Sequence, residues 1–318
     1  MDEKTYLTRD SGTKPQTFAG VETPEELGPI TVDVTDGLIK RYAFCMDDYR
    51  SWHFDRSPFG GPVAHASLLA NDLLTIYCTV YERVGSALHT EEELTFHAPV
   101  PVGETVTITG RYVDKYVRRG GGVIVMEAEA RDSSGKLLIS HRGAEVMEVH
   151  PGDVVGRSSA EPSADRIVPE ASSASVVSKP AARLDVGAPL PRLSKTLTQD
   201  QISVYSFVGE HEHNFHNDLE LAKSHGLDST IAQGLQTAGY FSELCTEFFG
   251  ADWFTSGYIK TKFLAPVYPD STITVTGKIA GQESSEGDRT TTLTELWAKD
   301  QDGRLVAVAW AKATTELQ

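Results

Sequence analysis

The chain contains two copies of one sequence pattern, and this internal repeat constrains the fold more than any other feature. Residues 94–100 (LTFHAPV) read like residues 261–267 (TKFLAPV), at a spacing of 167 residues. Residues 104–110 (ETVTITG) align with residues 271–277 (STITVTG) at the same spacing. The second pair places β-branched residues at alternate positions, which predicts a strand in each copy.

Two further pairs of stretches agree with this spacing to within one residue. Residues 130–135 (ARDSSG) match residues 298–303 (AKDQDG), and each places an Asp and a Gly where a hairpin turn needs them. Residues 63–65 (VAH) pair with residues 231–233 (IAQ). Four stretches with one common offset indicate a tandem duplication of a unit of about 140 residues.

Each copy has the same predicted order of elements: a strand, an irregular stretch, one long helix and several antiparallel strands. We expect the first helix over residues 66–84 and the second over residues 235–249. Their apolar stripes comprise Leu68, Leu69, Leu73, Ile76, Tyr77 and Val80 in the first helix and Tyr240, Phe241, Leu244 and Phe248 in the second. One helix and a curved antiparallel sheet per copy predict the α+β class.

These patterns divide the chain into four segments. We expect an irregular N-terminal segment over residues 1–30 and the first unit over residues 31–150. Residues 151–191 are rich in Ser, Ala, Pro and Gly and lack periodicity, which is typical of a linker. The second unit follows over residues 192–318.

Composition restricts the function of the chain. The net charge of −16 repels phosphate backbones and anionic lipid surfaces, so we expect neither a nucleic acid nor a membrane as partner. No apolar run approaches the roughly 18 residues of a membrane span, and the N-terminus lacks the order of a secretion signal. Cys45, Cys78 and Cys245 are scattered and odd in number, which argues against a disulfide framework and favours the cytoplasm.

The candidate site is residues 209–218 (GEHEHNFHND), just before a helix-like segment. Three histidines and two glutamates crowd into seven positions of this run. A histidine beside carboxylates suits proton transfer, because the imidazole pKa lies close to physiological pH. The alternative is a polar loop whose histidines bind backbone and solvent.

Together with residues 231–234 (IAQG), this run resembles the MaoC-like, or R-specific enoyl-CoA hydratase, family. That family has the pattern Asp-x-Asn-Pro-x-His-x-Asp, in which His216 takes the histidine position, Asp218 follows it, and His211 replaces the first aspartate. The run is also similar to Asn-x-His-x-Ile-His-x-Asp of the mesaconyl-C4-CoA (3-methylfumaryl-CoA) hydratases, which His213 matches.

The resemblance implies a double hotdog fold and a lyase that hydrates a 2-enoyl-CoA or dehydrates a 3-hydroxyacyl-CoA, without a cofactor or metal. The C-terminal unit would be the catalytic half and the N-terminal unit the substrate-holding half. His216 would be the lead acid/base, with His211 as its partner, Glu212 as the nearest carboxylate and His213 among the substrate-binding residues. The substrate would be an acyl-CoA or an acyl-carrier thioester.

Gln233 and Gly234 occupy the entry of the second helix, where free backbone N–H groups could bind a developing enolate oxygen. The alternative is that Gly234 only allows the helix to pack closely on the sheet. In the first unit, the resemblance places Tyr49, Trp52 and His53 along the acyl pocket. His53 with Asp55 forms a reserve catalytic pair.

Several alternatives remain open from the residues alone. A thioesterase could use Glu212 or Asp55 as its carboxylate, and a non-catalytic acyl-binding protein could have lost the family aspartate. A metal site formed by the three histidines lacks a matching second ligand group. The basic run at residues 115–119 could dock an anionic CoA ester or could be a solvated strand end. A homodimer is possible, although a fused pair already supplies the usual interface.

Overall fold

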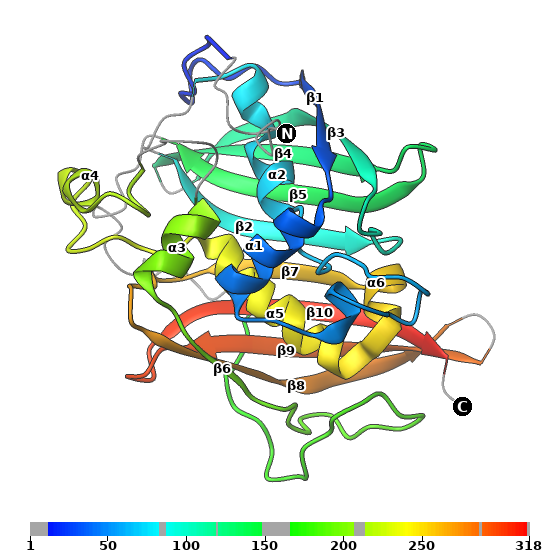
Figure 1. Ribbon diagram of the computed structural model, residues 1–318. Helices are drawn as coiled ribbons and strands as arrows, with labels where there is room; N and C mark the ends of the chain where they lie inside the picture. The colour runs from blue at the N-terminus through cyan, green and yellow to red at the C-terminus, as the bar shows by residue number, and fades with distance from the viewer. Residues whose placement is uncertain are drawn as a thin grey trace.

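A single ten-stranded antiparallel sheet forms the centre of the molecule (Figure 1). Its strand order is β1-β3-β4-β5-β2-β7-β10-β9-β8-β6, so the five strands of each half lie together and β2 pairs with β7 at the junction. The structure is a computed structural model that describes residues 12–82, 87–118, 120–147, 166–206, 214–285 and 288–316.

The first half begins with a strand and a helix and continues with the helical segments before its main strands. Its strands are β1 (Glu25–Asp33), β2 (Leu88–Phe96), β3 (Thr105–Arg118), β4 (Gly121–Arg131) and β5 (Leu137–Met147). Its helical segments are α1 (Asp36–Met46), η1 (Ser51–His53), α2 (Ala70–Thr75) and η2 (Ile76–Thr79).

The second half repeats this order with a longer central helix. Its strands are β6 (Leu193–Thr196), β7 (Tyr258–Phe263), β8 (Thr272–Ser284), β9 (Arg289–Lys299) and β10 (Leu305–Glu316). Its helical segments are α3 (Gln199–Ser206), α4 (Leu219–Ser224), α5 (Gly234–Phe249), η4 (Gly250–Asp252) and α6 (Trp253–Ser256).

The repeat seen in the sequence extends to individual hydrogen bonds. The amide of Ala64 donates to Val100 O at 2.8 Å, and the amide of Ala232 donates to Val267 O at 2.8 Å. The two predicted hairpin turns also have the same construction, because the glycine three residues after each turn Asp has a positive φ and donates its N–H to the Asp carbonyl. The two halves therefore share their topology and their local geometry.

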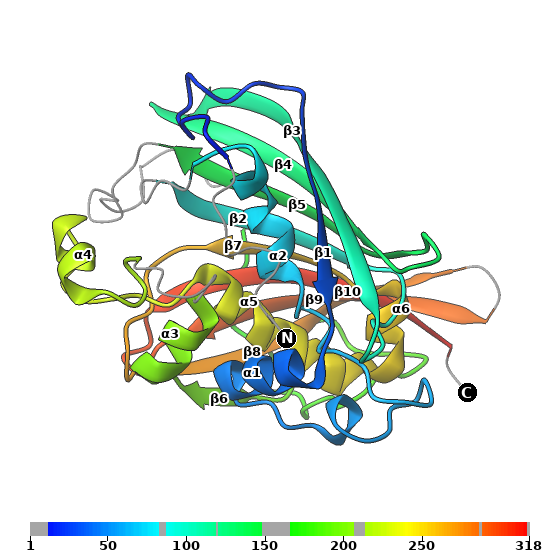
Figure 2. The ribbon, with the colours of Figure 1, turned by 45° about the horizontal axis from the view of Figure 1, so that its top comes forward.

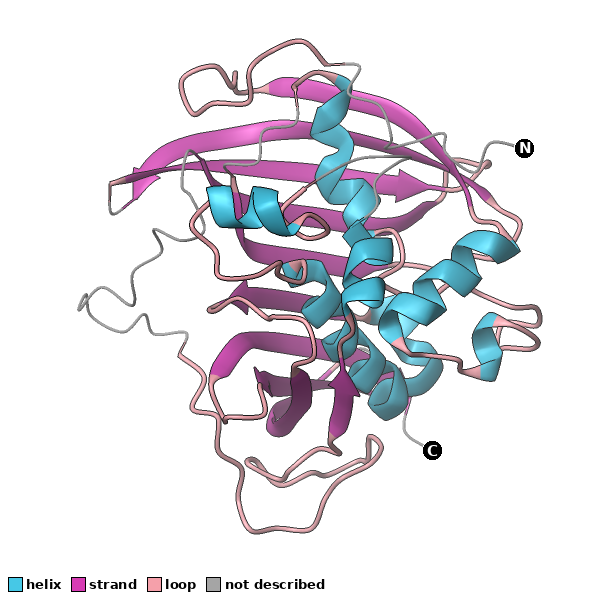
Figure 3. Cartoon of the chain, turned by 60° about the vertical axis from the view of Figure 1, so that its left-hand side comes forward, coloured by secondary structure: helices cyan, strands magenta, loops and turns pink. Residues whose placement is uncertain are grey.

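The helices cover one face of the sheet, which curves around α2 and α5 (Figures 2 and 3). The second predicted helix is confirmed, since α5 runs from Gly234 to Phe249 and is buried on nearly all sides. The described end of the expected linker also packs on the sheet, where the amides of Gly187 and Leu190 donate to carbonyl groups of β8.

The first predicted helix is wrong in length. In place of one helix over residues 66–84, the structure has only α2 (Ala70–Thr75) followed by the 3₁₀ segment η2. The hydroxyl of Thr75 donates to Asn71 O at 2.7 Å and that of Thr79 donates to Ile76 O at 2.8 Å. Side chains that bond to nearby backbone in this way, and β-branched residues in general, weaken a regular helix.

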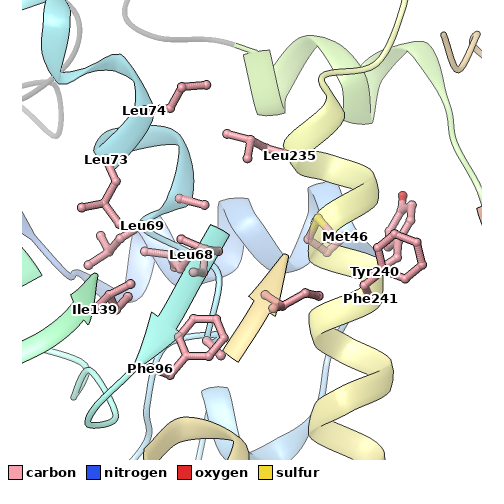
Figure 4. Packing of buried hydrophobic residues seen from close by; sticks show 14 of the residues in the cluster. Met46, Leu68, Leu69, Leu73, Leu74, Phe96, Ile139, Leu235, Tyr240 and Phe241 are labelled. Carbon is pink, nitrogen blue, oxygen red and sulfur yellow. The ribbon is translucent and has the colours of Figure 1, made fainter. Parts of the chain in front are cut away.

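The core is continuous between the two halves. Figure 4 shows Leu235 extending from α5 towards α2, where Leu73 and Leu74 are buried. Met46 of α1 lies against α5, because a Cβ at Gly239 would be only 2.5 Å from the Met46 Cε atom. The halves therefore interlock through their helices as well as through the shared sheet.

Candidate active site

His216 lies between α3 and α4, beside the segment that leads into α5. Its Nδ1–H donates to Ile231 O at 2.7 Å, and Gln199 Nε2 of α3 donates to His216 O at 3.0 Å. The half-buried ring also contacts Phe215, with 4.3 Å between ring centroids. Because a carbonyl oxygen can only accept, Nδ1 carries a proton and the basic lone pair of the neutral ring is on Nε2.

The N-terminus of α5 places backbone N–H groups three residues after Ile231. Gln233 precedes the helix with an extended backbone, and its side chain does not cap it. Within the part of the chain that the structure describes, the N–H groups of Gly234 and Leu235 have no hydrogen-bond acceptor. Uncapped amides and the helix dipole together favour a negatively charged oxygen at this point.

Gly234 also serves the packing role that the sequence left open. A Cβ at this position would lie 2.9 Å from ring atoms of Phe263 on β7, which is closer than carbon atoms approach without strain. The glycine therefore allows the start of α5 to rest on the sheet. This geometry is compatible with both roles considered for Gly234, binding of an enolate oxygen and close packing of the helix on the sheet.

The residues expected to work with His216 lie outside the described residues. They are His211, Glu212 and His213, and their roles stay predictions. Asp218, which follows His216 in the family pattern, is the N-cap of α4 and accepts a hydrogen bond from an amide of its first turn. That contact gives Asp218 a structural role in shaping the loop.

The first half holds a buried cluster of titratable side chains at the equivalent step of the repeat. His53 donates its Nδ1–H to Val63 O at 2.8 Å, and its Nε2 lies 3.7 Å from Asp48 Oδ2. His65 donates from Nε2 to Asp48 O at 3.0 Å and stacks on His53, with 3.5 Å between ring centroids. All three residues of this cluster, Asp48, His53 and His65, are less than one tenth exposed.

The charges of this cluster follow from its burial and its geometry. Burial opposes ionisation of Asp48, but the neighbouring imidazoles of His53 and His65 lower the pKa of its carboxyl. Burial, reinforced by repulsion from His53, lowers the pKa of His65 to about 3. We therefore expect an ionised Asp48 beside a neutral His65 at physiological pH.

A small pocket adjoins this cluster, and α5 of the other half forms one of its walls. Glu243 enters it from α5 and forms a buried ion pair with Lys195, at 2.9 Å. Burial, with repulsion from Asp48, raises the pKa of Glu243 to about 7 although Lys195 opposes the shift. The pocket lining comprises Tyr42, Met46, Asp48, His53, His65, Ala66, Ser67, Gly239, Ser242, Glu243 and Thr246.

Side chains of the second half hold the backbone that leads into Asp48. Three of them donate to the carbonyl groups of residues 44, 45 and 47 at the end of α1, where a helix has few N–H donors of its own. The pairs are Gln201 to Phe44 (3.0 Å), Gln236 to Cys45 (3.1 Å) and Lys195 to Asp47 (2.6 Å). The position of Asp48 therefore depends on contacts between the halves.

Asp48, His53 and His65 also offer ligand atoms that all lie within 4.8 Å of one another, which a metal ion could use. Two imidazole nitrogens of this group already donate to backbone oxygens, His53 Nδ1 to Val63 and His65 Nε2 to Asp48. A metal bound through the His65 Nε2 would have to replace the second of these bonds. The donor set could hold a metal, but the existing hydrogen bonds suit acid/base chemistry better.

The other candidates of the first half lie away from this pocket. Tyr49 is 60% exposed, and Trp52 packs against Phe254 of α6, with 6.1 Å between ring centroids. Asp55 is exposed, whereas the carboxylate that faces His53 is Asp48. Of these four candidates, only His53 lines the pocket.

Asp48 could have been found from the sequence. It precedes His53 by five positions, and Asp55 follows His53 by two, which is the Asp-x-Asn-Pro-x-His-x-Asp spacing that we applied to His216. Glu243 and Lys195 carry no comparable local signal.

A second buried cluster lies at the junction of the halves, where β2 meets β5 and β7. Glu92 Oε2 is 2.9 Å from His141 Nε2 and 3.2 Å from His89 Nε2. Burial opposes its ionisation, but the two histidines lower the pKa of Glu92. The equivalent positions of Glu92 and His141 in the second half are Ile259 and Ala309, so this cluster is specific to the first half.

The basic run on β3 makes contacts within the chain. Lys115 donates to the backbone oxygens of Phe18 and Val21, and Arg118 lies 3.9 Å from Glu91. These contacts assign Lys115 to holding the N-terminal segment and give no support to binding of an anion. Among the described residues, no helix is long and apolar enough to span a bilayer.

Two family models match this chain. Residues 185–299 match the MaoC like domain, and residues 20–141 match the FAS1-like, dehydratase domain region. Peroxisomal multifunctional enzyme type 2 of Drosophila melanogaster is 26% identical over 189 residues, which are 59% of this chain and 29% of that protein. The matched region is thus less than a third of the relative's length.

Solved structures show the same fold. A MaoC-like dehydratase superposes with a TM-score of 0.69 and 19% identity, over 94% of this chain and 98% of that one. A Mycobacterium tuberculosis protein described as a double hotdog gives a TM-score of 0.63 and 15% identity, over 96% of this chain and 100% of that one. The full-length Drosophila enzyme gives 0.61 and 18%, over 91% of this chain and 48% of that one. The predicted double hotdog fold is confirmed.

Proposed function

We propose that this chain, with a MaoC-like domain in its C-terminal half and a FAS1-like dehydratase region in its N-terminal half, is a hydro-lyase that acts on acyl thioesters. It adds water to a 2-enoyl-CoA or removes water from a 3-hydroxyacyl-CoA. One observation carries the proposal: the His216 imidazole is bonded to Ile231 O, three residues before the uncapped N-terminus of α5. A proton-transfer group and an anion-binding helix end thus come from one short stretch of chain.

The imidazole supplies the base. Hydration of a 2-enoyl thioester requires a group that takes a proton from water as its oxygen bonds to C3. With Nδ1–H held by Ile231 O, His216 presents Nε2 as that base in its neutral form. The imidazolium then returns the proton to C2, so the reaction adds one water and regenerates the catalyst.

The helix end stabilises the charge that develops on the thioester oxygen. As water attacks C3, electron density moves to that oxygen, and an enolate forms. The N–H groups of Gly234 and Leu235 at the start of α5 are positioned to donate to such an oxygen. Gln233 lies at the same point, and we assign it to substrate binding together with Gly234.

The partner groups of His216 are proposed from sequence alone. We assign His211 as the second proton-transfer group and Glu212 as the carboxylate that orients an imidazole, with His213 contacting substrate. The similarity of this run to mesaconyl-type hydratases favours a CoA ester with a short branched or dicarboxylic acyl group. These assignments concern the C-terminal half.

Incubation of the purified protein with crotonyl-CoA and, separately, acetyl-CoA tests the function. Hydration removes the enone absorbance of crotonyl-CoA and releases no thiol. A thioesterase instead releases free CoA from acetyl-CoA, which a thiol reagent detects. Absence of either change with the folded protein, over a panel of short, branched and dicarboxylic enoyl-CoA esters, would favour the non-catalytic acyl-binding alternative.

A further inference from the structure

We infer that Gln199 of α3 is a positioning residue that holds His216 in place for proton transfer. This inference rests on the proposed function, because the position of the imidazole affects the rate only if His216 is the acid/base group. It assigns a role to a side chain that lies outside the run of residues 209–218.

The side-chain amide of Gln199 joins the His216 backbone to the segment that leads into α5. Its Nε2 group donates one N–H to His216 O at 3.0 Å and the other to Ser203 Oγ at 2.9 Å. Its Oε1 atom accepts a hydrogen bond from the hydroxyl of Thr230. The amide thus uses both N–H groups and its oxygen at the same time.

The orientation of this amide follows from the chemistry of its partners. A backbone carbonyl can only accept, so the atom that faces His216 O must be the nitrogen, and Oε1 must face Thr230. Exchange of the two atoms would place two oxygens against each other without a proton between them. The bridge from His216 to Thr230 therefore has one arrangement.

Together with the imidazole, this bridge forms a closed cycle of hydrogen bonds. His216 Nδ1–H donates to Ile231 O at 2.7 Å, and Thr230 is the chain neighbour of Ile231. The same two backbone segments are therefore joined twice, once through the imidazole and once through Gln199. A ring that is held both at its backbone and at Nδ1 keeps the direction of Nε2 relative to the start of α5.

The helix α3 is itself fixed in the fold. Asn214 Nδ2 donates to Ser206 O at the end of α3, at 3.2 Å, and Asn214 Oδ1 accepts from the His216 amide at 2.9 Å. On the side of the first half, Gln201 Nε2 donates to Phe44 O of α1 at 3.0 Å. The helix therefore holds the His216 turn at two points and is tied to the first half.

Within the described residues, the first half has no bridge of this kind. There α1 begins with Asp36, which pairs with Lys40, and the residue before Val63 is Pro62, which has neither a hydroxyl nor an N–H group. His53 is nevertheless bonded to Val63 O by its imidazole. The bridge is thus an addition of the second half and is not required for the imidazole bond as such.

Gln199→Met tests the bridge, because methionine has a similar length and cannot donate a hydrogen bond. We expect kcat for crotonyl-CoA to fall by ~10- to 10²-fold and KM to change by less than about twofold. Thr230→Val should give a similar loss, and Thr230→Ser, which keeps the hydroxyl, should not. The double variant of Gln199→Met and Thr230→Val should be no slower than the slower single variant, because both changes break the same bridge.

Ser203→Ala is the matched control. It removes a partner of the same Nε2 group but leaves the bonds to His216 and Thr230 in place. Urea unfolding shows which variants are folded, and Thr230→Val carries the test if Gln199→Met is not. A loss of kcat in Ser203→Ala equal to that in Gln199→Met would assign the effect to the packing of α3 and overturn the inference.

The tautomer of His216 gives a readout that needs no substrate. The ¹⁵N chemical shifts of labelled imidazoles distinguish a nitrogen that carries a proton from one with a lone pair, and His216→Ala identifies the signals of this ring. At pH 8 we expect the wild type to hold the proton on Nδ1 and Gln199→Met to populate both tautomers.

The possible results separate the two proposals. An unchanged His216 tautomer in Gln199→Met, or an unchanged kcat, overturns the role of Gln199. If the tautomer changes as expected but the folded wild-type protein hydrates no enoyl-CoA, the bridge orients the imidazole and it is the proposed function that fails.

Discussion

His53 and His216 each donate an imidazole Nδ1–H to the backbone carbonyl at the same step of the repeat, that of Val63 in the first half and of Ile231 in the second. The distances are 2.8 Å to Val63 O and 2.7 Å to Ile231 O. A shared bond at this position sets the same tautomer in both rings. The surroundings differ, because Asp48 faces His53 whereas the uncapped start of α5 lies beside His216.

The role of His216 is measured directly by His216→Ala. We expect this change to lower kcat for a 2-enoyl-CoA by at least ~10²-fold, as loss of a general base does. His97→Ala is the control, since His97 is an exposed histidine whose ring bonds to the Ser140 hydroxyl. An unchanged kcat in the His216 variant would show that this residue is not the general base.

The repeat and the fold class could be predicted because their signals are local. The matched stretches around Phe96 and Phe263 place equivalent strands in the two halves, and the Asp-Gly turns at Asp132 and Asp300 follow β4 and β9 as expected. The helix α5 was predicted because an apolar stripe of large residues fills its length. Each of these features depends on residues close together in sequence.

The contents of the first pocket could not be predicted in full, because they depend on contacts between the halves. Glu243 on α5 and Lys195 on β6 both come from the second half and pair beside Asp47 and Asp48 of the first, and no periodicity links them. The helix over residues 66–84 was predicted too long because its apolar stripe continues past Thr75, where side-chain hydroxyls bond to the backbone and the helix tightens. Competition between side-chain hydroxyls and backbone N–H groups for the same carbonyl groups depends on the folded backbone, so the apolar pattern does not reveal it.

Gly234→Ala tests how closely α5 must rest on the sheet. The added Cβ would meet the Phe263 ring at 2.9 Å, so we expect the free energy of unfolding to fall by about 1 to 3 kcal/mol. Displacement of the helix start should also lower kcat. Gly61→Ala is the control, since a Cβ there meets nothing within 4 Å. If Phe263→Leu restores part of the stability lost in Gly234→Ala, the ring is the cause of the loss. Equal stability of Gly234→Ala and Gly61→Ala would contradict the packing argument.

Lys195→Met tests the buried ion pair of the second half that borders the pocket beside Asp48. Removal of Lys195 leaves Glu243 buried without its partner and deletes the hydrogen bond to Asp47 O, so we expect a loss of about 3 to 5 kcal/mol. Urea unfolding at pH 8 measures the change through the midpoint of the transition. The double variant with Glu243→Leu should recover much of the loss. A single variant within 0.5 kcal/mol of wild type would show that the pair contributes nothing to stability.

His65→Gln tests the acid sensitivity of the first pocket. Burial lowers the pKa of His65 to about 3, so as the pH falls below 6.5 the unfolded chain takes up a proton that the folded ring does not. Stability from this group is therefore complete above pH 6.5 and is lost progressively towards pH 3. Between pH 7 and pH 5 the loss is about 2 kcal/mol at 1.4 kcal/mol per pH unit.

Gln is the matched replacement because Gln233 occupies the same position in the second half, and its amide can still donate to Asp48 O. Urea unfolding of both proteins at pH 7 and pH 5 isolates the histidine, since all other titrating groups are shared. We expect the wild type to lose about 2 kcal/mol more than His65→Gln over this range. Equal losses would mean that His65 takes up its proton in the folded protein over this pH range. That result would contradict a neutral imidazole next to Asp48.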